Sequence, residues 1–207
     1  FNYLDRLGQY KDRLQALKVI SDHEHFMQLN YPVILPNMGS VTEATIVTFW
    51  QRHFLSGSLL HEVNLALTSG STPQRLDTLQ VLLRVLRKSD LHPLYQDPES
   101  KQRLATTFFP LILIAIERYP QLKSVSMEEK QKWALAVGYV IKNSFKERAL
   151  CQWWRGDTQK NHVGFMNLLL LVVKVVEGDH LGREISFTVL DILEDFIHDM
   201  KEELQYE

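Results

Sequence analysis

A chain of 207 residues with 45% hydrophobic and 23% charged residues has the composition of an ordinary globular protein and can bury a sizeable core. Its 23 basic and 25 acidic residues give a formal net charge of −2, which excludes the strongly basic surface of a dedicated nucleic-acid-binding protein. The single cysteine, Cys151, excludes an internal disulfide framework and indicates a reducing compartment, so a cytoplasmic location is expected.

The longest strongly apolar run, residues 166–176, is interrupted by Lys174 and is far shorter than the ~20 residues that cross a bilayer. No membrane span is therefore predicted. The chain begins FNYLDRLGQY, without an initiator methionine or a signal-peptide pattern. We therefore expect that it is a fragment of a longer protein.

Helical periodicity over residues 4–20 predicts a first helix, which leads into the phrase SDHEHF at residues 21–26. Two histidines that flank a carboxylate raise the question of a metal site. In a helix, residues two apart point roughly 200° apart, so His23 and His25 cannot bind one ion from the same face. The spacing HExxH of helical zinc sites is also absent. A helix end with locally satisfied imidazoles is the favoured interpretation.

Apolar residues at three- and four-residue steps predict one long amphipathic helix over 41–67, with Ser40 and Glu43 as its capping box. His53 and His61 share a face of this helix but lie two turns apart, so they cannot share a metal ion without further ligands. We regard this histidine ridge as a candidate protein contact.

Thr72 and Pro73 predict the start of the next helix, which should end near residue 89. A further apolar series over 104–116 contains Pro110, which predicts a kink or two abutting helices. Pro120 is expected to end that element.

Ser126 and Glu129 form a capping-box pattern that predicts another helix start. Short helices are expected over 146–154 and 157–177, and a last helix over 183–207 carries an apolar stripe with acidic residues elsewhere. Strand signals are nearly absent. The sequence therefore predicts an all-α fold of antiparallel helix pairs, either stacked as an α-solenoid or closed as a compact bundle.

Two groups of residues invite a chemical role. Cys151 and His162 resemble a nucleophile and base, but a buried structural thiol is the favoured interpretation, because the cysteine lies in the apolar stretch LCQWW. Glu128 and Glu129 are interpreted as a solvated helix face, like Glu147 and the acidic residues near the carboxyl terminus. No phosphate-binding or nucleophile-elbow motif is present.

Trp153, Trp154 and Arg155 are the most conspicuous candidates for a binding surface, because adjacent helical residues face different directions and one indole can remain exposed as an anchor. The favoured interpretation is a tryptophan pair that wedges one helix pair against the next, since such side chains are usually well buried.

Several phrases, in this order, resemble the dedicator-of-cytokinesis (DOCK) family of guanine nucleotide exchange factors, especially its zizimin-like C and D branches. The phrases are ISDHEHFMQLNYPV (20–33), FWQRHFLSGSLLHEVNLAL (49–67), LQVLLRVLRKSDLHPLYQDPESKQRLATTFFPLI (79–112), EEKQKWALAVGYVIKNSFKERALCQWW (128–154) and EISFTVLDILEDFIHDMKEEL (184–204). The connection near 178–184 is shorter than in the family pattern, which leaves the register of the last helix open.

The resemblance implies that residues 1–207 form a single armadillo-like region between a lipid-binding C2-type domain and a C-terminal exchange domain. The catalytic elements of the family belong to the exchange domain, so no catalytic, cofactor-binding or metal-binding residue is assigned here. The implied partners are other domains of the same protein, regulatory proteins or peptides, a Rho-family GTPase through the absent exchange domain, and a second copy of the chain. Other domains would recruit the protein to the plasma membrane.

The expected function is therefore that of a non-catalytic scaffold. Two alternatives stay open, namely a fragment that acts directly on Rho-family GTPases and a self-association module.

Overall fold

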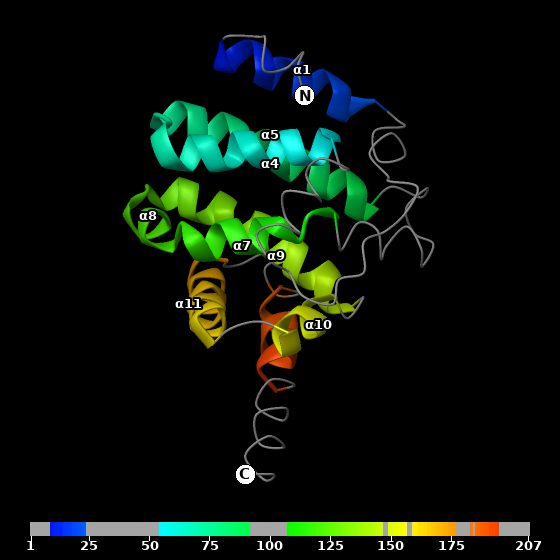
Figure 1. The fold of residues 1–207 in the computed structure, drawn as a ribbon, viewed down its shortest axis with the longest axis vertical. Coiled ribbons are helices and arrows are strands. Elements are labelled where there is room, and N and C mark those ends of the chain that lie inside the picture. The colour runs from blue at the N-terminus through cyan, green and yellow to red at the C-terminus, as the bar shows by residue number, and fades with distance from the viewer. Residues whose placement is uncertain are drawn as a thin grey trace.

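The structure is a computed structural model (Figure 1). It describes residues 9–23, 54–91, 107–146, 149–156, 159–176, 183 and 185–194. All regular elements within these ranges are helices, which confirms the all-α prediction. In chain order they are α1 (Tyr10–Asp22), α4 (Phe54–Ser69), α5 (Thr72–Leu91), α7 (Pro110–Glu117), α8 (Tyr119–Ser124), α9 (Met127–Lys146), α10 (Ala149–Gly156) and α11 (Gln159–Val175). Residues 185–194 are also helical.

The helices are stacked along the long axis of the molecule (Figure 1). Helix α1 lies at one end and packs on α4 and α5, α5 packs on α9, and α9 packs on α7, α10 and α11. Helices α10, α11 and 185–194 lie toward the other end. One apolar core runs through the whole stack, from Leu14 in α1 to Ile192. Because each layer packs mainly on the layers next to it, the arrangement fits a helical solenoid.

Helix α1 ends where the sequence predicts, within the SDHEHF phrase. Asp22 is its last residue, and His23 adopts an extended conformation as its C-cap. The Nζ of Lys88, near the end of α5, donates hydrogen bonds to the carbonyls of Ser21, Asp22 and His23 at 3.2, 3.0 and 2.6 Å. This lysine satisfies carbonyls that a helix end leaves without intrahelical donors. His25 lies outside the described residues.

Helices α4 and α5 form an antiparallel pair joined by Gly70 and Ser71. Helix α5 begins at Thr72, with Pro73 in its first turn as predicted, and extends to residue 91 instead of 89. A Cβ on Gly70 would lie 2.6 Å from the carbonyl oxygen of Ala66, so only glycine fits this close turn. The predicted capping box of Ser40 and Glu43 lies outside the described residues.

Two prolines set the boundaries of α7 and α8. Helix α7 begins at Pro110, directly after a bend and turn, which confirms the predicted break in the apolar series. That series ends at Glu117, just before Pro120, as the sequence predicts. The short helix α8, which carries Pro120 in its first turn, was not predicted. A first-turn proline loses no helical hydrogen bond, because the first amides of a helix have no intrahelical acceptor.

Helix α9 is the central helix and begins with the predicted capping box. The backbone N–H of Ser126 donates to Glu129 Oε2 at 2.9 Å, and the backbone N–H of Glu129 donates to Ser126 Oγ at 3.3 Å. Its buried residues include Trp133, Val137 and Ile141. These side chains place α9 in the core between α5 on one side and the α7, α10 and α11 layers on the other.

Candidate protein-interaction surfaces

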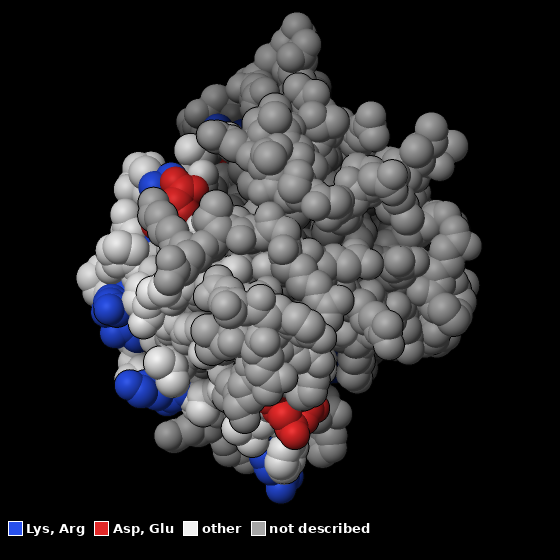
Figure 2. All heavy atoms as spheres, turned by 60° about the horizontal axis from the view of Figure 1, so that its bottom comes forward, with Lys and Arg blue, Asp and Glu red and all other residues white. Residues whose placement is uncertain are grey.

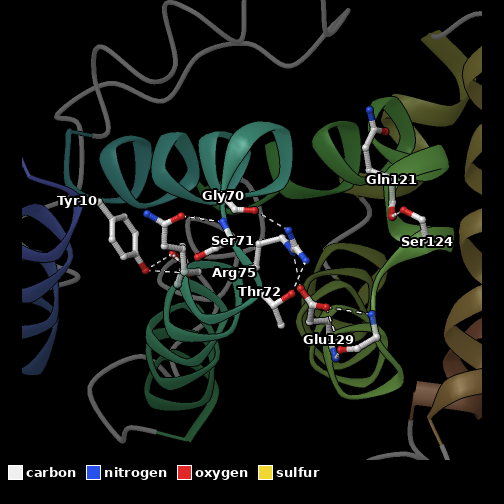
Figure 3. Close-up of polar contacts among 11 residues, drawn as sticks. Tyr10, Gly70, Ser71, Thr72, Arg75, Gln121, Ser124 and Glu129 are labelled. Carbon is white, nitrogen blue, oxygen red and sulfur yellow. Dashed lines mark hydrogen bonds and ion pairs between the residues drawn. The ribbon is translucent and has the colours of Figure 1, made fainter.

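A network of polar contacts joins α5 to α9 (Figure 3). The Nε of Arg75 forms an ion pair with Glu129 Oε1. The same guanidinium donates to the Gly70 carbonyl at 2.6 Å and to Thr72 Oγ1 at 3.0 Å. One arginine therefore ties the α4–α5 turn, the start of α5 and the start of α9 together.

Glu129 is held ionised at this joint. Burial by itself would raise the pKa of this carboxyl, but the hydrogen bonds from Arg75 and from Ser126 outweigh burial and bring the pKa below its usual value. The Glu129 side chain is only 1% exposed, so the interpretation of Glu129 as part of a solvated face is wrong, whereas its neighbour Glu128 is exposed. All of these groups bond one another across the joint, and we assign the joint a structural role.

A second buried carboxylate joins α1 to α4. Arg13 donates from Nε to Glu62 Oε1 at 2.6 Å and from Nη2 to Glu62 Oε2 at 3.4 Å. The Glu62 side chain is 6% exposed. Such a bidentate contact restricts both the distance and the relative orientation of α1 and α4.

Trp153 and Trp154 lie in an aromatic cluster that packs α10 on α11 and on Phe109, the N-cap residue of α7. The Trp153 ring centroid is 5.4 Å from that of Phe165 and 5.8 Å from that of Phe109. The ring of His162 stacks on Trp154 at 4.0 Å, and its Nε2 lies 2.8 Å from the Trp154 carbonyl oxygen. The two tryptophans are 2% and 7% exposed, so they do wedge helices together; contact of either with a partner stays a prediction.

The remaining candidates are placed only in part. His61 is exposed on α4, whereas His53 and the side chain of Arg155 lie outside the described residues, so the ridge stays a prediction. Cys151 is half-buried instead of fully buried. Among the residues that the structure describes, no three His, Cys, Asp or Glu side chains lie together in a way that would hold a metal ion.

An exposed apolar stripe on α11 escaped the sequence reasoning. Val163, Leu170 and Val173 are 58%, 57% and 42% exposed. With half-buried Met166 they follow one another at spacings of three, four and three residues, which places them on one face of the helix. The opposite face of α11 is buried through Phe165, Leu168, Leu169 and Val172. The spacing was visible in the sequence, but only burial shows that one helix carries two apolar faces.

Charge does not dominate the described surface that Figure 2 shows. Lys and Arg side chains form a few separate groups there, Asp and Glu side chains lie close to some of them, and uncharged surface lies between the groups. None of the described helices combines the length and apolar character that a membrane span requires.

Comparison with known proteins finds relatives among DOCK proteins. The chain is 28% identical over 149 residues to dedicator of cytokinesis protein 7 of Homo sapiens, with 58% of this chain and 7% of the relative covered. It is 24% identical over 153 residues to guanine nucleotide exchange factor SPIKE 1 of Arabidopsis thaliana, with 74% and 8% covered. It is 27% identical over 145 residues to dedicator of cytokinesis protein 9 of Homo sapiens, with 66% and 7% covered.

No family model and no solved structure matches the chain. The chain thus has homologues in the DOCK family and spans only about 7% to 8% of their length. The assignment to the C and D branches and to the armadillo-like region stays a prediction.

Proposed function

We propose that residues 1–207 form a non-catalytic, armadillo-like scaffold within a DOCK-type guanine nucleotide exchange factor for Rho-family GTPases, of the zizimin-like branch. The region positions the lipid-binding and exchange domains and docks regulators in the cytoplasm, with recruitment to the plasma membrane through other domains. The relatives support this proposal, because one of them is itself named a guanine nucleotide exchange factor.

The observation that carries the proposal is the pair of apolar faces on α11. One face packs into the core and the other exposes Val163, Leu170 and Val173 in a row. A helix that is apolar on two sides is typical of a position between two packed layers. We assign the exposed row to another part of the same protein, because the described helices already stack layer on layer and the homologues are more than ten times longer than the matched segment.

Nucleotide release tests this function directly. Release would be measured from a panel of Rho-family GTPases, with this chain alone and with it added to a separately purified exchange domain. The scaffold predicts no acceleration by the chain alone and altered release in the mixture. Acceleration by the chain alone would overturn the scaffold and favour the direct action on GTPases.

A charged side chain placed among the exposed apolar residues of α11 tests whether they contact another part of the protein. Leu170→Glu should leave the melting temperature nearly unchanged, because surface substitutions usually change stability by less than about 0.5 kcal/mol. Leu170→Glu should also abolish the change in nucleotide release that the chain causes when it is mixed with the exchange domain. Val19→Glu is the matched control, since Val19 is 61% exposed on α1 at the other end of the stack.

Light scattering at two protein concentrations tests the alternative of a self-association module. Such a module would show a molecular mass that rises with concentration, and Leu170→Glu would abolish this rise.

A further inference from the structure

A groove lies between α1 and α5 and encloses about 380 Å³. The two helices run in the same direction. The hydroxyl of Tyr10, at the start of α1, donates to the Gln74 carbonyl at 2.8 Å, and Lys88, near the end of α5, bonds the end of α1. The groove therefore follows both helices, and its volume is within the usual range of protein binding sites.

The lining of the groove is apolar at the floor and polar along both sides. Leu14 and Val81 are buried at the floor. The exposed side chains that line it are Lys11, Gln15 and Lys18 from α1, and Asp77, Gln80 and Arg84 from α5. The aliphatic stems of the lysines extend the apolar surface toward solvent. Such a cross-section suits an amphipathic ligand.

Positive charge prevails on the sides of the groove. Arg84 forms an ion pair with Asp22 at 2.8 Å, so its charge is partly compensated. Neither Lys11 nor Lys18 takes part in an ion pair between described residues. These two lysines lie seven residues apart on one helix, which corresponds to roughly 10 Å. Acidic side chains two turns apart on a partner helix match that spacing.

We propose that the groove between α1 and α5 binds an amphipathic helix of a partner protein, with an apolar stripe over Leu14 and Val81 and acidic side chains that pair with Lys11 and Lys18. Seating a helix by its apolar face in a groove is a recurring mode of peptide recognition. The complementary charges fix which helices are accepted, because a basic helix would meet like charges. This site is separate from the row on α11 and does not depend on the proposed scaffold function.

The test uses the full chain and a designed helical peptide with leucine at every third and fourth position and glutamate on both sides of that stripe. Binding is followed by fluorescence anisotropy of the labelled peptide. We expect saturable binding that weakens with salt. The double variant Lys11→Glu/Lys18→Glu should lower the affinity roughly tenfold, because two weak attractions become repulsions.

The matched control is Lys123→Glu/Lys174→Glu, which changes the net charge equally at exposed lysines on α8 and α11. Equal loss in both double variants would reveal attraction by net charge alone and overturn the site. The same peptide with lysine in place of glutamate should not bind.

Vesicles of phosphatidylcholine with phosphatidylserine provide the other comparison. Binding to vesicles through Lys11 and Lys18 without binding of the peptide would identify a lipid surface and overturn the protein partner. Chemical-shift changes of the Leu14 and Val81 methyl groups on peptide addition would support the assigned floor, and unchanged shifts at saturation would contradict it. Circular dichroism verifies that each variant is folded.

Discussion

Arg75 of α5 and Glu129 of α9 meet across the joint between two helical layers, and Glu129 closes the capping box of α9 with the same carboxylate. The side chain of Glu129 is almost fully buried, at 1% exposure, while that of Arg75 is 19% exposed. One side chain thus both starts a helix and fixes its neighbour. Substitution of either Arg75 or Glu129 should therefore affect both the start of α9 and its packing on α5.

Arg75→Ala should lower the free energy of unfolding by about 3 kcal/mol, because it leaves the buried Glu129 carboxylate without its charged partner. Urea denaturation measures this loss. Arg87→Ala is a suitable control, since Arg87 is exposed on the same helix. Equal stability of the two variants would show that the ion pair contributes nothing at this joint.

Acid should weaken the fold through Glu129. The pKa of this carboxyl is lower in the folded chain than in the unfolded chain, so its ionised form stabilises the fold above the unfolded value of about 4.3. That contribution is lost as the pH falls through the lower, folded-state pKa. The urea midpoint of Glu129→Gln, followed from roughly pH 6 to pH 3, should therefore decline less steeply than that of the unchanged chain. Glu128→Gln, at an exposed position, should retain the steeper decline.

Gly164→Ala should destabilise the chain although alanine favours helices. A Cβ on Gly164 would lie 2.5 Å from Cγ2 of Ile116, so α11 and α7 would have to move apart. Overpacking costs about 1–3 kcal/mol, which outweighs the gain in helix propensity of at most about 1 kcal/mol. Adding Ile116→Leu removes the β-branched methyl and should restore part of the melting temperature. A more stable Gly164→Ala variant would show that the contact is looser than described.

Trp154→Ala should lower the free energy of unfolding by about 3–5 kcal/mol, because it removes a buried ring that stacks on His162. Trp154→Phe keeps an aromatic ring and should cost less. Binding to the exchange domain, measured well below the melting temperature, separates packing from contact. Unchanged binding would assign Trp154 to the core alone, whereas lost binding in a folded variant would make it a contact residue.

Local signals predicted the helices well. The capping box at Ser126, the break at Pro110 and the first-turn Pro73 each act within a few residues, so their effects can be read from short stretches. The partner of Glu129 lies 54 residues earlier in the chain, and no local pattern points to it. The stripe around Leu170 has ordinary helical spacing, and only the packed neighbours of α11 reveal that it is a second apolar face.

The two arginine and glutamate pairs have a further consequence for assembly. Arg13 reaches a glutamate 49 residues later, and Arg75 reaches one 54 residues later, so both arginines pair with a buried acid from the helix pair that follows. A stack with the layers exchanged or shifted by one turn would bury Glu62 or Glu129 without a cation. An incorrect arrangement leaves a buried carboxylate unpaired, which raises its free energy. The two ion pairs therefore select the order of the layers mainly by destabilising the alternatives.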